Sequence, residues 1–90
     1  MTEEQERVLH SISRVIDENR DALVEIHQRR RLILSNLRKR KFRLKERFKA
    51  VRYYEELGKR AKNRKRVITK LVRFCDWFRR TREKRVIKVA

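Results

Sequence analysis

Helix-breaking residues are almost absent from this chain, and their absence limits the folds open to it. The 90 residues contain no proline and a single glycine, Gly58. The common residue types are arginine, lysine, glutamate, leucine and isoleucine, and most of these favour helices. We predict an all-α protein in which a long N-terminal amphipathic, coiled-coil-like helix is followed by a basic helical hairpin.

The first predicted helix has a clear start signal at Thr2. A threonine N-cap followed three residues later by Gln5 is the pattern of a capping box, in which each side chain bonds the other's backbone N–H. Glu3, Glu4 and Glu6 place negative charge in the first turn, where the helix dipole favours it. We therefore expect the helix to begin immediately after Thr2.

An apolar stripe with heptad spacing runs along residues 1–37. Such a stripe is stable in water only when it is covered by another helix. Asn19 and Arg30 interrupt it. A buried Asn19 would fix the register of the pairing, whereas an Asn19 at the edge would only contact water, and both alternatives stay open. We predict that the segment self-associates or docks onto a helical partner through Leu9, Ile12, Ile16, Leu23, Ile26 and Ile33.

Gly58 is the strongest helix-termination signal, because it follows Leu57 where a left-handed residue would end a helix. We predict three segments: an acidic and apolar helix at 1–37, a basic hairpin at 38–84 that turns at Gly58, and a flexible tail at 85–90. The polar pair Ser35-Asn36 is a weaker place for a break. Without proline or glycine beside it, a helix continuous to Leu57 is favoured.

Positive charge is concentrated in the second part of the sequence. The chain has a net charge of +17, yet residues 1–28 carry three basic and seven acidic groups, and residues 29–90 carry 26 basic and five acidic groups. A surface built only for solubility would mix the two signs. Like charges at this density repel over a Debye length of about 8 Å until an anion neutralises them. This asymmetry predicts a polyanionic partner, most simply nucleic acid.

Arginine and lysine on rigid helices contact phosphates, and arginine adds bidentate geometry and stacking. Phe42 either stacks on an exposed base or packs against the returning helix. Trp77 flanks the apolar face of the last predicted helix, and it too could either cover the core or contact the ligand. The predicted nucleic-acid-binding residues are Arg29, Arg30, Arg31, Arg38, Lys39, Arg40, Lys41, Phe42, Arg43, Lys45, Lys62, Arg64, Lys65, Arg66, Arg73 and Arg80.

RNA is favoured slightly over DNA as the ligand, because the basic part has few asparagine or glutamine side chains suited to reading the major groove. The alternative is a structural adaptor that docks into an acidic protein assembly or a ribonucleoprotein. We expect an intracellular protein, in the cytoplasm or nucleus, whose basic runs resemble import signals. Membrane binding is a weaker hypothesis, since the first helix is acidic and no apolar run exceeds three residues.

Residues suited to catalysis or metal binding do not converge in the sequence. His10 and His27 are 17 residues apart and point about 100° away from each other on a straight helix. Cys75 falls on an apolar stripe, where a small buried hydrophobe is expected rather than a nucleophile. One glycine cannot build a phosphate-cradling loop. We predict no enzymatic activity, no cofactor and no metal.

Overall fold

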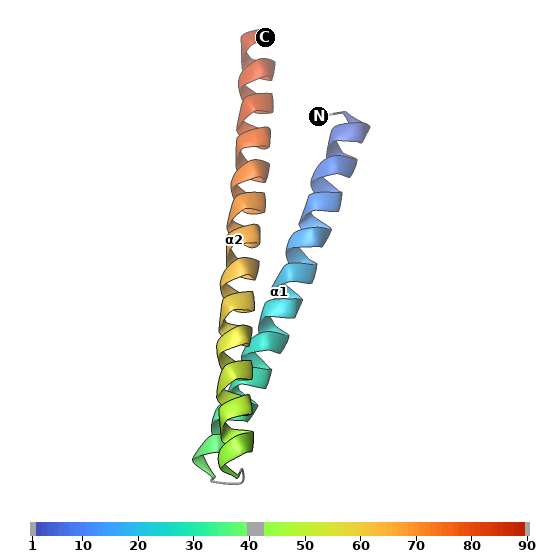
Figure 1. Ribbon diagram of the computed structural model, residues 1–90. Helices are drawn as coiled ribbons and strands as arrows, with labels where there is room; N and C mark the ends of the chain where they lie inside the picture. The colour runs from blue at the N-terminus through green and yellow to red at the C-terminus, as the bar shows by residue number, and fades with distance from the viewer. Residues whose placement is uncertain (1, 40–42, 90) are drawn as a thin grey trace.

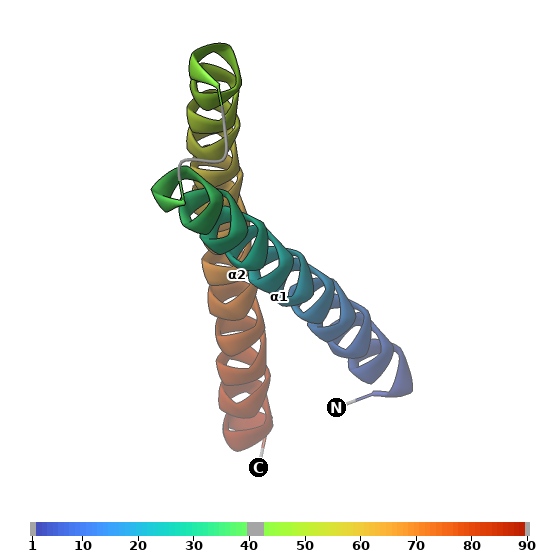
Figure 2. The ribbon, with the colours of Figure 1, turned by 90° about the horizontal axis from the view of Figure 1, so that it is seen from below.

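The chain forms a hairpin of two long antiparallel helices (Figure 1). The computed structural model describes residues 2–39 and 43–89, with side chains up to Thr81. Helix α1 spans Glu3–Arg38 and helix α2 spans Leu44–Val89. The resulting rod measures 70 × 17 × 15 Å, and the N- and C-termini lie at the same end. Seen along the rod, the two helices are inclined to one another (Figure 2).

The predicted all-α class and the predicted start of the first helix are both confirmed. The backbone N–H of Gln5 donates to Thr2 Oγ1 at 3.4 Å, and the backbone N–H of Thr2 donates to Gln5 Oε1 at 3.1 Å. These reciprocal bonds form the capping box and satisfy two amide groups that the helix itself leaves without partners.

The predicted position of the turn is wrong. The chain reverses between Arg38 and Leu44, and Gly58 lies inside α2. The segment predicted as a flexible tail at 85–90 is helical as far as Val89, and residue 90 lies outside the described part of the chain. Nothing in residues 85–89 interrupts a helix, since they contain neither glycine nor proline.

Polar contacts on both sides of the turn explain why the helices end and begin there. The Arg47 guanidinium donates from Nη2 to the Leu37 carbonyl oxygen at 2.9 Å, which satisfies a carbonyl in the last turn of α1. Glu46 accepts the backbone N–H of Arg43 at 3.2 Å and so caps the start of α2. Both caps come from charged side chains of α2, so no glycine is needed at this turn.

Gly58 instead provides space for a side chain of the other helix. A Cβ atom at this position would lie 3.1 Å from Nη2 of Arg30 and 3.4 Å from its Cζ. The Arg30 guanidinium lies over the Tyr54 ring, 4.2 Å from the ring centroid. Arg30, which interrupts the apolar stripe of α1, is therefore accommodated by an aromatic face and by the absence of a side chain at Gly58.

Alanine at position 58 should reveal this contact. Alanine is favoured over glycine by about 1 kcal/mol within a helix. We expect Gly58→Ala to deliver that full gain in an Arg30→Ala background and a smaller gain in the wild-type chain, because the new methyl group crowds the guanidinium. Chemical denaturation of the four proteins of this cycle measures the coupling. Equal gains in the two backgrounds would contradict the placement of Arg30 against Gly58.

The apolar core lies along the seam between the helices. Leu9 and Ile16 of α1 and Cys75 of α2 form its buried cluster, while Leu57 and Ala61 are buried nearer the turn. The predicted burial of Cys75 is confirmed. Partly buried side chains complete the cluster: Ile12, Ile68, Leu71, Val72 and Phe78.

The predicted self-association seam finds its partner helix within the same chain. Leu9, Ile12 and Ile16 pack against α2, and self-association through them would require the hairpin to open. The other three seam residues are half-buried on α1: Leu23, Ile26 and Ile33. The heptad pattern identified a stripe that needs covering, and α2 covers it.

Candidate polyanion-binding surface

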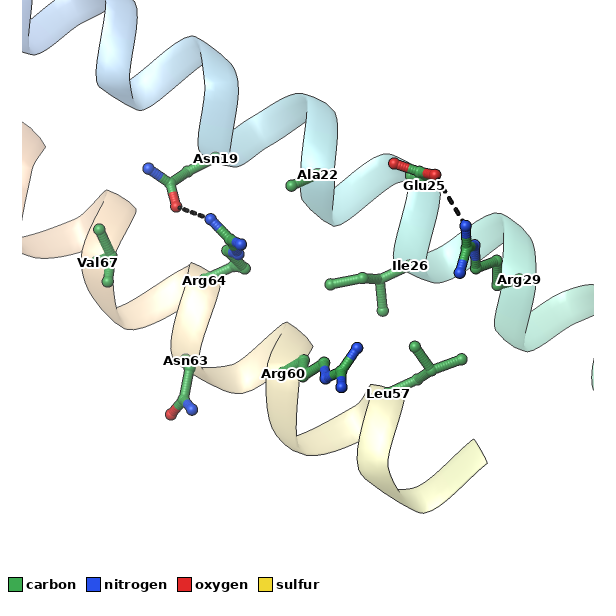
Figure 3. Close-up of a pocket in the computed structure, with 10 residues that line it drawn as sticks. All are labelled: Asn19, Ala22, Glu25, Ile26, Arg29, Leu57, Arg60, Asn63, Arg64 and Val67. Carbon is green, nitrogen blue, oxygen red and sulfur yellow. Dashed lines mark hydrogen bonds and ion pairs between the residues drawn. The ribbon is translucent and has the colours of Figure 1, made fainter. Parts of the chain in front are cut away.

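Three arginine side chains from the two helices line a groove of about 570 Å³ beside the seam. Arg29 comes from α1, and Arg60 and Arg64 come from α2 (Figure 3). The apolar floor of the groove includes Ile26 and Leu57. We call this site the Arg60 groove. Glu25 is the only acidic residue that lines it, so its net charge is positive.

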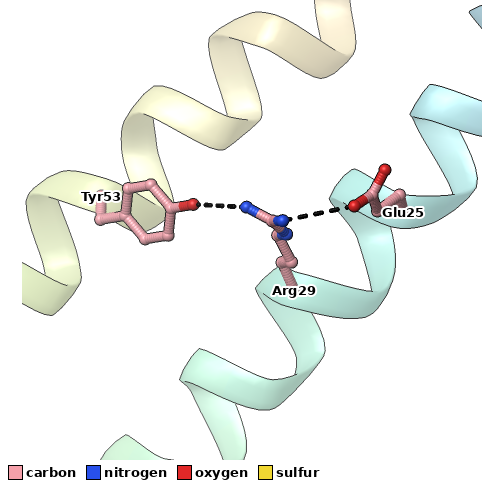
Figure 4. Close-up of polar contacts among 3 residues, drawn as sticks. All are labelled: Glu25, Arg29 and Tyr53. Atoms are coloured by element: carbon pink, nitrogen blue, oxygen red, sulfur yellow. Dashed lines mark hydrogen bonds and ion pairs between the residues drawn. The ribbon is translucent and has the colours of Figure 1, made fainter.

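Arg29 is held between a carboxylate and a phenol (Figure 4). Its Nη2 lies 3.3 Å from Glu25 Oε1, and its Nη1 donates to the Tyr53 hydroxyl at 3.1 Å. The hydrogen bond and the electrostatic interaction with Tyr53, followed by the charge of Glu25, raise the pKa of Arg29 above its ordinary value. The guanidinium is exposed, so the pair contributes little to stability. Its effect is to orient a permanent cation across the gap between the helices.

Asn19 fixes the position of a second arginine. Its side chain is only 7% exposed, and its Oδ1 accepts a hydrogen bond from Arg64 Nη1 at 2.9 Å. Its Nδ2 donates to the Val15 carbonyl oxygen at 2.7 Å. Of the two alternatives for Asn19, the buried one is correct. Because Asn19 and Arg64 belong to different helices, their bond defines how α1 and α2 are aligned.

Loss of the Asn19 carboxamide should weaken the hairpin. We expect Asn19→Ala to be less stable than Asn63→Ala by about 1–2 kcal/mol, because only Asn19 is buried and bonded across the helices. Both variants gain the same helix propensity, so this gain cancels in the comparison. Urea denaturation followed by circular dichroism measures the difference. Equal stabilities would show that the Asn19–Arg64 bond does not contribute.

A row of exposed cations, with one tryptophan among them, follows the face of α2 that lies outside its buried seam with α1. Its members recur every three or four residues, which places them on one side of a helix about 32 Å long. All of them are exposed, and none has an ion-pair partner in the part of the chain whose side chains are described. We call this row the outer stripe: Lys59, Lys62, Arg66, Lys70, Arg73, Trp77 and Arg80.

Ion pairing does not neutralise this surface. Arg29–Glu25 is the one ion pair among the side chains that the structure places. Residues 59–80 contain ten basic groups and a single acidic one, Asp76. Trp77 lies within the row and is 59% exposed. The centroid of its ring lies 5.9 Å from the centroid of the Phe74 ring. The surface therefore combines uncompensated positive charge with an exposed aromatic face.

The predicted binding residues lie in four places in the structure, and Lys62 belongs to two of them. Residues 29, 30, 62, 64 and 65 line grooves between the helices, and residues 62, 66, 73 and 80 lie on the outer stripe. Residue 31 is exposed on α1, whereas residues 38, 39, 43 and 45 are exposed around the turn. Three predicted members lie outside the described residues: Arg40, Lys41 and Phe42.

Three basic residues of these surfaces are not among the predicted binding residues: Lys59, Arg60 and Lys70. The spacing does indicate two of them, because Lys59 lies three residues before Lys62 and Lys70 lies four residues after Arg66. Arg60 gave no such signal, since only the position of α1 shows that it faces a groove. A turn at Gly58, as the sequence predicts, would leave Arg60 beside the turn and not opposite α1.

Among the described residues, no cluster of histidine, cysteine, aspartate or glutamate is arranged to hold a metal ion. Across the same residues, neither helix contains a segment long and apolar enough to cross a membrane. Comparisons with protein families, with characterised proteins and with solved structures give no match to this chain.

Proposed function

We propose that the chain is a non-enzymatic nucleic-acid-binding protein that contacts phosphates through α2. The observation that supports this proposal is the outer stripe, a row of exposed cations without ion-pair partners on one face of a rigid helix. Site residues on this surface include Lys62, Arg66, Arg73 and Arg80. An intracellular site of action, in the cytoplasm or nucleus, belongs to the same proposal.

Counterion release would supply the affinity. Each phosphate neutralised by an arginine or lysine frees a condensed cation, and this entropy gain drives binding without any sequence preference. Arg66, Arg73 and Arg80 would add paired hydrogen bonds to phosphate oxygens. Trp77 lies between the last two of these and is exposed enough to stack on an unpaired base.

RNA is favoured over DNA within this proposal. Reading the major groove requires side chains such as asparagine or glutamine at helix positions that meet base edges. On the basic helix α2, Asn63 is the single residue of either type, and it lines the Arg60 groove. Duplex or structured RNA is recognised mainly through its shape and backbone, which demands less of such side chains.

Fluorescence anisotropy with labelled duplex RNA, duplex DNA and single-stranded RNA of one length tests the proposal. We expect dissociation constants of about 10⁻⁶ M or tighter for duplex RNA near physiological salt. The value for duplex DNA should be the same or weaker. The absence of binding to all three probes at moderate salt would contradict the proposal.

A structural adaptor is the second candidate function, and an exposed apolar surface favours it. Ala22 and Val67 line the Arg60 groove. Val15 lies seven residues before Ala22 and Phe74 lies seven residues after Val67, so each continues the same helix face toward the chain termini. Phe74 is 42% exposed, and Val15 is similarly exposed. A hairpin with so few buried residues would gain stability from a further helix, either a second copy or a partner protein.

The two candidate functions make different predictions for the purified chain. Self-association or partner docking through this apolar surface should be lost in Phe74→Ser, while the affinity for RNA is retained. Sedimentation velocity of the wild-type chain and of Phe74→Ser measures self-association and so distinguishes the two functions. A wild-type chain that stays monomeric at all concentrations and still binds RNA would count against self-association and favour the nucleic-acid-binding function.

A further inference from the structure

A second groove, of about 440 Å³, lies on the other flank of the seam from the Arg60 groove. We call it the Gly58 groove. Residues 27 and 30 of α1 line it, together with residues 55, 58, 59, 62 and 65 of α2. Helical spacing places these α2 positions on the opposite side of Leu57 from Arg60 and Arg64. The groove therefore presents a separate surface to a ligand.

Arg30 is a fixed cation in this groove without a compensating anion. Its Nε is buried and has no hydrogen-bond acceptor. No carboxylate lies within ion-pair distance of it among the described side chains. Tyr54 covers one face of the guanidinium, and the missing side chain at Gly58 leaves room for its Nη2 edge. A partly buried charge of this kind is costly unless an anion reaches it.

Three lysines line the same groove as this arginine. Lys59, Lys62 and Lys65 follow one another at steps of three residues along α2 and all line the groove. Glu55 is the one acidic residue among the lining positions, and it forms no ion pair with any described side chain. Four cations against one carboxylate leave the groove strongly positive.

We propose that the Gly58 groove is a discrete binding site for a phosphate group of the nucleic-acid backbone. This inference rests on the proposed function and adds a fixed point to it. The accessible N–H groups of Arg30 would donate to phosphate oxygens, and the three ammonium groups would surround the remaining charge. Since Tyr54 and Gly58 already hold the guanidinium in place, less conformational entropy is lost on binding.

The site would set the register of the nucleic acid on the protein. Lys59 and Lys62 line the groove and also belong to the outer stripe, so the two surfaces are continuous. A phosphate held at Arg30 would direct the adjoining backbone along α2 toward Arg66 and Arg73. The outer stripe supplies affinity at many equivalent positions, whereas the groove selects one of them.

Arg30→Met and Arg31→Met form a matched pair that tests the site. Both remove one positive charge and keep an unbranched apolar side chain, but Arg31, itself a predicted contact, is exposed and outside the groove, so any additional loss in Arg30→Met belongs to the groove. We expect Arg30→Met to bind duplex RNA about tenfold more weakly than Arg31→Met. The second probe, inorganic phosphate followed by NMR shifts of the backbone amides around Gly58, should show weaker binding that is lost in Arg30→Met alone.

A second pair of variants distinguishes loss of the site from a change in folding. Gly58→Leu fills the groove without altering the charge and improves helix propensity, whereas Ser11→Leu adds the same side chain at an exposed position on α1. We expect Gly58→Leu to reproduce the tenfold loss and Ser11→Leu to bind as wild type. Circular dichroism confirms that each variant is helical.

The experiments distinguish failure of the phosphate site in the Gly58 groove from failure of the proposed nucleic-acid binding. Equal affinities of Arg30→Met and Arg31→Met for both probes would overturn the groove site while leaving nucleic-acid binding intact. Failure of the wild-type chain to bind RNA would overturn the proposed function, and the phosphate titration would still decide the groove. A difference confined to RNA identifies a backbone phosphate, and a difference confined to inorganic phosphate identifies free phosphate as the ligand.

Discussion

Replacing Lys62, Arg66 and Arg73 with glutamine is expected to weaken binding to duplex RNA by roughly two orders of magnitude at low salt. The three side chains are exposed on one face of α2 and have no ion-pair partners within the described part of the chain. Each lost phosphate contact should also reduce the slope of log K against log salt by about 0.9, so the triple variant should lose nearly three units. Anisotropy titrations at several salt concentrations measure both effects.

The matched control for this variant removes three charges from the other helix. Arg7, Arg14 and Arg20 are exposed on α1, and their replacement by glutamine lowers the net charge by the same amount. We expect this control to keep the wild-type salt slope, because these arginines lie in the acidic part of the sequence. Equal losses in the two triple variants would mean that net charge alone governs binding and that the outer stripe has no special role.

Leu57→Ala should produce the largest loss of stability. Leu57 is 1% exposed and lies beside Ile26 of α1, so its truncation leaves a cavity between the helices. Substitutions of this kind cost about 2–5 kcal/mol, which is a large part of the total stability of a small domain. Chemical denaturation followed by circular dichroism measures the free energy of unfolding.

Leu44→Ala is the control for the Leu57 variant. Leu44 begins α2 and is 71% exposed, so its truncation should change stability by no more than about 0.5 kcal/mol. The expected difference in stability depends on the chain reversing before Leu44 and on α2 continuing through Gly58. If both variants lose the same stability, Leu57 does not lie at a seam between the helices.

Local signals allowed the helical class and the start of α1 to be predicted. Without proline, nothing in the chain forbids helix over most of its length, and the Thr2–Gln5 capping box involves residues only three apart. The burial of Cys75 also followed from its place on an apolar stripe. In each case the signal lies within a few residues of the position predicted, although Cys75 is buried against Leu9 and Ile16 of the other helix.

The turn could not be placed from local signals. Arg47 caps a carbonyl ten residues earlier in the sequence, a contact that exists only once the chain has reversed. Gly58 had the right residue type for a helix end, but its small size is used to admit Arg30 from the other helix. A single sequence does not distinguish a glycine that ends a helix from a glycine that makes room for a side chain of another helix.

The same limitation applies to the seam and to the candidate site. Heptad spacing at Leu9 and Ile16 shows that a helix must cover the stripe, but it does not distinguish a second chain from a later segment of the same chain. The outer stripe was partly predictable because its members share one helix face. The grooves were not, since Arg29 and Arg60 meet across a pairing whose register depends on the position of the turn.

The dependence of RNA affinity on salt is the most direct test of the proposal that exposed cations of α2 hold a polyanion. Wild-type chain and a duplex RNA long enough to cover the outer stripe should give a slope of log K against log salt steeper than about −4, corresponding to five or more phosphates. A slope of about −1 to −2 would correspond to one or two phosphates and would contradict the outer stripe as the binding surface.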